Sequence, residues 1–416
     1  MAGAKNGLGL ICLALVLGFA LLHAVAPHIY LFVTRIPDGV AKPHPFADLR
    51  AILQGGACWR QGVNVYAPST CLGGGVFNYS PLLLLAAWAP IGPADALAGG
   101  LFFSATYAAA LAALPVPLNG RDCLRRAAAA FSPAAYYALE QGNLDTLIFA
   151  LTVLALRLPW RQRHWGYALF ALSAAAKFYP AALFVLALRE DRRRLACLAV
   201  AGLAAGALAM ALYGHGLLAA VAQIPSGTPF RASFGRIDLP RGLAMMRLLP
   251  PGGAEIWSWT IALGALAVAA WRRRTWARAL AVLAADEALF LVAGAAVTLF
   301  CFMAAQNIEY RALFLLLLLP GLARLVPLGW SFRALPWLIT LLMWEAVPRA
   351  ALAGLTQPYL PHPAMFGFWL LREVLWWGVI AECLAATLAF VTNQATRLYH
   401  GKLTQPGGAH NMRTES

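Results

Sequence analysis

Charge is scarce in this chain, and acidic charge is the scarcest. Asp, Glu, Lys and Arg together make up 12% of its 416 residues, whereas hydrophobic residues make up 61%. A soluble domain carries about 25% charged and about 45–50% apolar residues, so the composition excludes a cytosolic enzyme and a disordered tail. With only 7 cysteines in this length, a small disulfide scaffold is excluded too. Because the apolar residues form long blocks with few charges, the sequence predicts an all-α polytopic membrane protein.

The charges that are present are mostly positive. Lys and Arg number 32 against 17 Asp and Glu, a formal net charge of +15. In a soluble chain such an excess would point to nucleic acid. In a membrane protein it is better explained by cytoplasmic loop charges that fix the topology, so no nucleic-acid partner is expected.

Three basic clusters divide the first half of the chain. They contain Arg121, Arg125 and Arg126; Arg157, Arg161 and Arg163; and Arg189, Arg192, Arg193 and Arg194. The clusters lie about 30–35 residues apart, so a single span of about 20 residues between each pair would place alternate clusters on opposite sides. Polar breaks lie midway in both intervals, at 140–143 and at 177–180. We therefore predict two hairpins of short or broken helices whose polar apices reach the far face and line a cavity.

The complete layout has about twelve membrane-embedded helices, several of them short, with both termini cytoplasmic. In this layout residues 1–391 form a single membrane domain, within which 34–79 and 214–253 are large outer loops. Residues 392–416 are expected to form a flexible cytoplasmic tail. Further spans are predicted at 8–33, 195–213, 254–271, 287–304, 311–323, 335–349 and 367–391.

Cys58 and Cys71 are the two cysteines that share the first outer loop. In an oxidising compartment a disulfide between them is expected, and two unlinked thiols are the alternative. No Cys and His spacing resembles a zinc site, and the outer acidic residues do not form a recognisable ligand set. No metal or other cofactor is therefore expected.

The first outer loop begins with an amphipathic segment. Phe46, Leu49 and Leu53 share one apolar face, and Asp48 lies on the polar side near its start. A carboxylate near the membrane surface beside an apolar wall can act as a general base. The alternative is a carboxylate that only favours the helix dipole.

Asp48 is followed by an ordered set of short motifs. They are Gly55-Gly56, Asn64-Val65-Tyr66-Ala67-Pro68, Phe77-Asn78-Tyr79-Ser80-Pro81-Leu82, Gln141-Gly142-Asn143 and Lys177-Phe178-Tyr179-Pro180. Over residues 40–190 this set resembles bacterial glycosyltransferase family 87, the polyprenol-phosphate-mannose-dependent mannosyltransferases of the GT-C superfamily.

The resemblance implies a GT-C-type bundle with amphipathic juxtamembrane helices in the first outer loop. It also implies an enzyme of the bacterial inner membrane whose active site faces the periplasm. Such an enzyme moves a sugar, mannose by family default, from a polyprenyl-phosphate donor to a glycolipid or glycan acceptor. Asp48 matches the family's acidic position, and the resemblance gives it the role of general base in an inverting displacement.

A lipid-phosphate leaving group requires nearby positive charge. Lys177 is the first candidate, because an ionisable residue at membrane depth is costly and usually functional; the alternative is a lysine that extends to the surface. Arg236 and Arg241 are second candidates, with a solvated or lipid-headgroup role equally open.

The expected sugar or acceptor contacts are Tyr79, Asn143, Asp145, Glu309 and Tyr310. Asn143 and Asp145 fit helix caps equally well. A simple ion pair between Glu309 and Arg311 is the favoured alternative for Glu309. Aromatic belts at membrane interfaces are the alternative for Tyr79.

Two other functions compete with this one. A polymerase or ligase of lipid-linked glycans uses outer-loop arginines but does not rely on an acidic residue after the first helix. A transporter or flippase also has broken helices and buried charges, but often shows two related halves, which this chain lacks.

Overall fold

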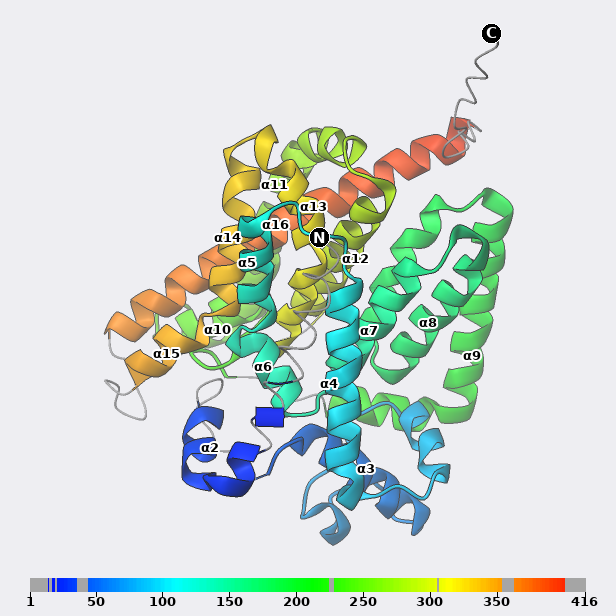
Figure 1. The fold of residues 1–416 in the computed structure, drawn as a ribbon, viewed down its shortest axis with the longest axis vertical. Helices are drawn as coiled ribbons and strands as arrows, with labels where there is room; N and C mark the ends of the chain where they lie inside the picture. Colours follow the sequence, from blue (N-terminus) through cyan, green and yellow to red (C-terminus); the bar gives the residue numbers. More distant parts are fainter. Residues whose placement is uncertain are drawn as a thin grey trace.

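The structure is a computed structural model that describes residues 14, 17–18, 21–35, 44–223, 228–304, 307–353 and 363–400. Nearly all of its regular structure is helical, which confirms the predicted all-α membrane fold (Figure 1). Within the described residues the strands are β1 (Ser233–Phe234) and β2 (Asn307–Ile308), an antiparallel pair in which Ser233 lies opposite Ile308.

The first half of the chain alternates α-helices with short 3₁₀ segments. In order these are α2 (Pro27–Thr34), α3 (Ala47–Arg60), η1 (Thr70–Leu72), η2 (Pro81–Trp88), η3 (Pro93–Asp95), α4 (Ala96–Ala113), α5 (Gly120–Ala130), α6 (Pro133–Glu140), α7 (Leu144–Arg157), η4 (Trp160–Gln162), α8 (Arg163–Ala176) and η5 (Tyr179–Arg189). The predicted first span is interrupted at Ala26, directly before Pro27 opens α2. Residues 8–13, 15–16 and 19–20 of this predicted span lie outside the described part of the chain.

The second half contains the longer helices. They are α9 (Arg192–Ala222), α10 (Asp238–Met245), η6 (Pro251–Gly253), α11 (Ala254–Ala281), α12 (Ala285–Ala304), η7 (Glu309–Leu317), α13 (Leu319–Leu325), η8 (Val326–Leu328), α14 (Trp330–Met343), α15 (Ala346–Ala353) and α16 (Pro363–His400). Helix α16 continues to His400, so the start of the segment predicted as a loose tail is helical. Residues 401–416 lie outside the described part of the chain.

The membrane-embedded helices include full spans and shorter segments, as the prediction of about twelve helices with several short ones expected. Among the described residues five helices are long and apolar enough to cross, or up to seven if each bent helix pair forms one span. The others are shorter segments such as η5, which is apolar but only 11 residues long. At about 1.5 Å per residue or slightly more, such a segment reaches only part of the way across a hydrocarbon core of about 30 Å.

Both predicted helix breaks are confirmed. Helix α6 ends at Glu140 and α7 begins at Leu144, with a bend of 108° between them. Helix α8 ends at Ala176 and η5 begins at Tyr179. The first break is built by local sequence, since Gly142 adopts a left-handed conformation with φ of 59° and Asn143 caps the helix that follows.

Polar caps start several of these helices. The side chains of Asn119, Ser132, Asn143 and Asp191 accept hydrogen bonds from backbone N–H groups in the first turns of α5, α6, α7 and α9. Each cap satisfies a donor that the helix itself leaves without a partner, and is worth about 1 kcal/mol.

Helix α12 is the centre of the packing. It contacts α16, η5, η7 and α13, and most of its apolar stretch is buried inside the protein. Helices α4, α7 and α8 pack in sequence on one side of this centre, and α11 packs along α16 on the other (Figure 1).

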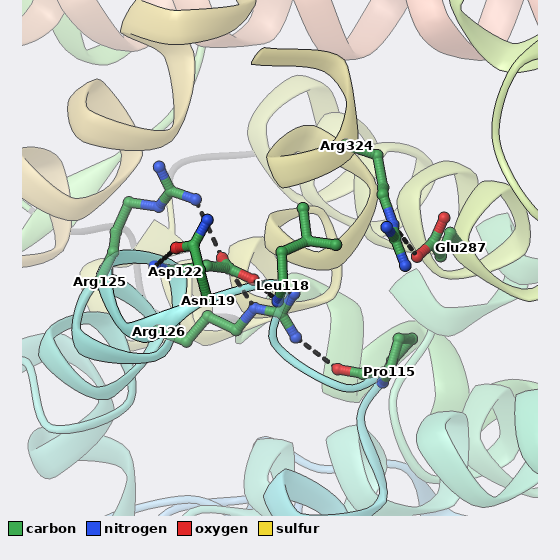
Figure 2. Close-up of polar contacts among 8 residues, drawn as sticks. All are labelled: Pro115, Leu118, Asn119, Asp122, Arg125, Arg126, Glu287 and Arg324. Carbon is green, nitrogen blue, oxygen red and sulfur yellow. Dashed lines mark hydrogen bonds and ion pairs between the residues drawn. The ribbon is translucent and has the colours of Figure 1, made fainter. Parts of the chain in front are cut away.

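The first basic cluster is more than a set of solvated topology charges. Arg125 and Arg126 are buried, and their guanidinium groups donate to the carboxylate of Asp122 at 3.0 Å and 2.6 Å (Figure 2). Near them Arg324 donates to Glu287 at 2.8 Å, which joins α13 to α12. Part of the basic excess is therefore neutralised inside the bundle.

Candidate functional site

The start of α3 is bound to the break between α6 and α7. The backbone N–H of Phe46 donates to the carbonyl of Glu140 at 2.7 Å, and the N–H of Asp48 donates to the carbonyl of Gln141 at 2.9 Å. The N–H groups at the start of α3 and the carbonyl groups at the end of α6 have no hydrogen-bond partners within their own helices, so they pair with each other. The carboxylate of Asp48 is thereby held beside residues nearly a hundred positions further along the chain.

Gly142 allows this close approach. Its φ of +59° is in the left-handed region, and a Cβ placed on it would lie 3.0 Å from the Cβ atoms of both Phe46 and Leu49. Glycine is the residue that satisfies both conditions at little cost. The segment before α3 also packs against α4, where the ring of Phe46 occupies the space that a side chain at Gly100 would need.

Asn143 connects the predicted base to the predicted cation. Its side-chain oxygen accepts from the backbone N–H of Asp145 at 3.0 Å and from the Lys177 ammonium at 2.9 Å. Its amide nitrogen donates to the carboxylate of Asp48. Asn143 is fully buried, and its bond to the N–H of Asp145 is buried with it, whereas Asp48 and Lys177 are partly exposed at the cavity. The helix cap expected from the sequence is therefore present, whereas the contact of Asn143 with sugar hydroxyls stays a prediction.

Asp145 gathers two cations around one buried carboxylate. The Lys177 ammonium pairs with Oδ1 of Asp145, the Tyr179 hydroxyl donates to the same oxygen at 2.9 Å, and Nε of Arg311 lies 3.4 Å from Oδ2. Asp145 itself is 0% exposed. The two positive charges exceed the single negative charge of Asp145, and the carboxylate of Asp48 on the other side of Asn143 supplies the second negative charge of the site.

These groups surround a cavity of about 360 Å³. Its polar lining comes from several elements far apart in sequence: Asp48, Asn78, Tyr79, Ser80, Tyr137, Gln141, Lys177, Tyr179, Asn307, Tyr310 and Arg311. The volume falls within the range of about 300–1,000 Å³ that is typical of ligand sites. The predicted cavity at the two helix breaks is thus present, with Asp48 and Lys177 both on its wall.

Aromatic rings lie around the ammonium group. The rings of Tyr79 and Tyr310 each have their centre 5.8 Å from Nζ of Lys177, and Tyr137 packs edge-on against Tyr310 at 5.5 Å. Ring faces at this distance attract a cation and also offer surfaces on which a sugar ring can pack.

The Lys177 ammonium lies in the break between α8 and η5, outside the candidate membrane spans. Burial lowers the pKa of this ammonium, and Arg311 lowers it further, whereas Asp145 and Asp48 raise it. Asp145 is the larger of the two opposing carboxylate effects, so the charge on Lys177 depends on Asp145.

A disulfide supports the loop that carries Asp48. Cys58 in α3 is joined to Cys71, with Cα atoms 6.0 Å apart, and the Gln54 amide donates to the carbonyl of Cys71 at 2.9 Å. Cys58 also packs in a small separate core with Val65 and Phe77. This core fixes the part of the loop that ends at Tyr79 on the cavity wall.

Residues 77–301, more than half of the chain, match the family model of glycosyltransferase family 87. The chain belongs to glycosyltransferase family 87. No curated protein and no solved structure matches it. The matched region contains Asn143, Asp145 and Lys177, begins after Asp48 and ends before Arg311. The protein is therefore a membrane glycosyltransferase, which argues against the transporter alternative.

Two of the three basic residues predicted to bind the donor phosphate of this glycosyltransferase lie outside the cavity. The Arg236 guanidinium donates to Glu255 at 2.6 Å and to the carbonyl of Met303 at 2.9 Å, and it lies over the ring of Trp259 at 4.2 Å. Arg241 is exposed on α10 and does not line the cavity. Of the three, only Lys177 lines it.

Glu309 also faces away from the cavity. It receives two hydrogen bonds from Arg349, at 2.8 Å and 2.9 Å, and is buried. The ion pair between Glu309 and Arg311 that we favoured as the alternative is wrong, because Arg311 pairs with Asp145 instead. The two charged residues on either side of Tyr310 thus point to different parts of the bundle.

Arg311 was left out of the predicted site residues of this glycosyltransferase, because an ion pair with Glu309 was the favoured alternative. It lies at the start of an apolar run, next to Tyr310, which was predicted. The signal in the sequence was a single arginine directly before a long apolar segment, since a charge there needs a buried partner. The nearby Glu309 was taken as the partner of Arg311 instead of Asp145. Tyr137 and Tyr179 line the cavity as well and were not singled out.

Proposed function

We propose that this glycosyltransferase transfers a hexose, mannose by family default, from a polyprenyl-phosphate donor. The acceptor is a hydroxyl group of a glycolipid or glycan on the periplasmic face of the bacterial inner membrane. The single observation that carries the proposal is that Asp48 and Lys177 line one cavity and are bridged by Asn143.

The charge of the cavity supports a donor with one phosphate. Lys177 and Arg311 carry two positive charges, and the carboxylates of Asp145 and Asp48 carry two negative ones, so the cavity as a whole is neutral before a donor binds. A polyprenyl-phosphate sugar is a phosphodiester and brings a single negative charge, which meets the two cations at the end of the cavity away from Asp48. A diphosphate-linked donor would bring at least one further negative charge into a buried site, and an uncompensated buried charge is costly.

In the proposed reaction Asp48 acts as the general base. The acceptor hydroxyl oxygen bonds to the anomeric carbon while its proton passes to the carboxylate of Asp48. The bond between the anomeric carbon and the phosphate oxygen breaks, and its electron pair stays on polyprenyl phosphate. Attack opposite the departing phosphate inverts the anomeric configuration. Because such a transition state resembles an oxocarbenium ion, a carboxylate is basic enough for this role.

Lys177 and Arg311 stabilise the departing phosphate. The leaving group gains a negative charge as the bond breaks, and two cations already fixed by Asp145 require little rearrangement to meet it. Asn143 holds the base by its amide group and the ammonium by its oxygen, so both ends of the reaction are positioned by one side chain.

The sugar is proposed to lie against Tyr79 and Tyr310. Both rings flank Lys177, and the amide groups of Asn78 and Gln141 lie on the same wall with donors and acceptors suited to sugar hydroxyls.

Transfer from defined donors tests the donor class and the base together. The purified protein in lipid vesicles is given a glycolipid acceptor and one labelled hexose as a polyprenyl monophosphate, a polyprenyl diphosphate or a nucleoside diphosphate. We expect transfer from the monophosphate only, with the product's anomeric configuration inverted. We also expect Asp48→Asn to be inactive and Asp95→Asn, an exposed carboxylate at a helix start, to be active.

Transfer from the nucleotide sugar or from the diphosphate would overturn the donor assignment, and the diphosphate result would favour the lipid-linked glycan polymerase or ligase. Retention of configuration, or full activity of Asp48→Asn, would overturn the mechanism.

A further inference from the structure

A second cavity, of about 540 Å³, lies where α8 and α9 meet. It shares no lining residue with the cavity that contains Asp48. Its walls are made by the ends of η4, α8, η5 and α9: Arg161, Arg163, His164, Tyr167, Glu190, Arg194, Cys197 and Leu198.

The charges of this second cavity are partly fixed and partly open to a ligand. Glu190 is 1% exposed; it pairs with Nε of Arg163 at 2.8 Å and accepts from the Tyr167 hydroxyl at 2.9 Å. This buried pair forms a rigid part of the wall. The Arg161 and Arg194 side chains are exposed; the side chain of Arg194 is 58% accessible and lies 3.6 Å from the carboxylate of Asp191 and 3.9 Å from that of Glu190. Three arginines against Glu190 and Asp191 leave one positive charge at the mouth.

Helix α9 leads from this cavity along an apolar, uncovered surface. None of the residues in its most apolar stretch is buried inside the protein. Val200 and Leu203, one to two turns beyond Cys197, are 66% and 75% exposed. Figure 1 shows α9 as the outermost helix on its side of the bundle. Such a surface on a membrane span faces lipid tails.

We propose that this second cavity binds the phosphate headgroup of an anionic phospholipid whose acyl chains lie along α9. Arginine forks bind phosphate oxygens with charge-assisted hydrogen bonds, and basic pockets at the ends of membrane helices suit anionic headgroups. The basic mouth of the cavity would bind the phosphate headgroup, and the apolar face of α9, which begins beside it, would contact the acyl chains. A free phosphate would use the mouth alone and leave the α9 surface unexplained.

The bound lipid would also lie beside the end of α16. Arg192, at the start of α9, donates to the carbonyl of Leu398 at 2.9 Å, and Arg397 donates to the carbonyl of Arg189. The headgroup therefore lies next to a junction at which the segment between η5 and α9 meets the end of α16.

Cys197 provides a direct readout of occupancy. It is an exposed free thiol on the cavity wall, whereas Cys123 is a partly exposed free thiol outside it. The full-length protein is placed in phosphatidylcholine vesicles with or without phosphatidylglycerol and treated with N-ethylmaleimide, which crosses bilayers. Peptide mass spectrometry then gives the labelling rate of each cysteine. Cys123 corrects for any general effect of surface charge on thiol reactivity.

We expect phosphatidylglycerol to slow labelling of Cys197 but not of Cys123. In the double variant Arg161→Gln with Arg194→Gln this protection requires about thirtyfold more phosphatidylglycerol, since each basic residue near an anionic surface contributes about fivefold in affinity. Both side chains are exposed, so the fold is expected to tolerate the change. The matched control is Arg121→Gln with Arg193→Gln, which removes the same charge from exposed positions outside the cavity and keeps the protection.

Three results would overturn the proposal. The first is equal labelling of Cys197 with and without phosphatidylglycerol. The second is equal loss of protection in the control variant, which would mean general surface attraction. The third is full protection by millimolar inorganic phosphate in phosphatidylcholine vesicles, which would assign the cavity to free phosphate. None of these readouts depends on glycosyl transfer.

Discussion

Replacing Asn143 by alanine separates its structural role from its role in the site. The side chain caps α7 through the N–H of Asp145, accepts from Lys177 and donates to Asp48. Loss of a cap costs about 1 kcal/mol of stability. Loss of the other two contacts removes hydrogen bonds to charged groups, worth about 1.5–3 kcal/mol each in a buried setting.

The variant should lose activity even where it remains folded. Without the amide, the carboxylate of Asp48 is no longer aimed by its buried partner, and a misplacement of about 1 Å in a catalytic group lowers rate by about a hundredfold. We therefore expect kcat to fall about a hundredfold. In an Asp48→Asn background the same change should lower the remaining rate much less, because the base that Asn143 positions is already absent.

Asn119 provides the matched control. It caps α5 through the N–H of Asp122 at 3.0 Å, with the same residue type and the same kind of contact (Figure 2), and it does not line the cavity. Asn119→Ala should cost a similar cap energy and leave transfer near the wild-type rate, as measured by thermal unfolding and by the vesicle assay. If both variants lose transfer equally, or if Asn143→Ala keeps it, the reasoning about Asn143 is refuted.

Three further predictions concern the surroundings of the site. Asp145→Asn removes the main charge that keeps Lys177 protonated against burial, so the alkaline limb of the pH–activity profile should move to lower pH; an unmoved limb would contradict this. Gly142→Ala should lower activity and stability by more than Gly74→Ala. Both glycines have positive φ, which costs an alanine about 1–2 kcal/mol, but of these two positions only Gly142 would also bring a Cβ into contact with neighbouring side chains. Equal effects of the two substitutions would argue against the close packing at Gly142. Cys71→Ser should lower the unfolding free energy by about 3 kcal/mol, as expected for a bridge across 13 positions, and an unchanged melting temperature would refute it.

The sequence was most informative where local chemistry decides the structure. The break at 140–143 follows from a glycine and a capping asparagine within a few residues, and the break at 177–180 from a proline and a lysine in an apolar stretch. The amphipathic spacing around Asp48 also predicted the start of α3, although the helix extends to Arg60. Together these features predicted a cavity on the correct part of the chain.

Long-range ion pairs could not be predicted in the same way. Arg311 pairs with Asp145 and Glu309 pairs with Arg349, although the two residues are separated by only one position. On a helical turn neighbouring side chains point in different directions, so their partners depend on which helices pack on each side. Arg236 was placed in an outer loop by charge alone, but it is held by Glu255 and by a carbonyl of α12.

Which of the embedded helices are full spans and which are short segments could not be predicted, for a related reason. Hydropathy marks apolar segments but does not distinguish a crossing helix from a short 3₁₀ segment such as η5, which is enclosed by α8 and α12. Irregular backbone of this kind is stable only where protein surrounds it, and that surrounding structure is not visible in one segment's sequence.

The central claim is that Asp48 takes the acceptor's proton while Lys177 and Arg311 hold the donor phosphate. Its most direct test measures donor affinity and transfer rate on the same Asp48→Asn preparation. The proposal predicts a donor dissociation constant near that of the wild type, and a transfer rate lower by about 10²–10⁴-fold, the usual contribution of a general base. Transfer at the wild-type rate, or a loss of donor binding as large as the loss of transfer, would contradict it.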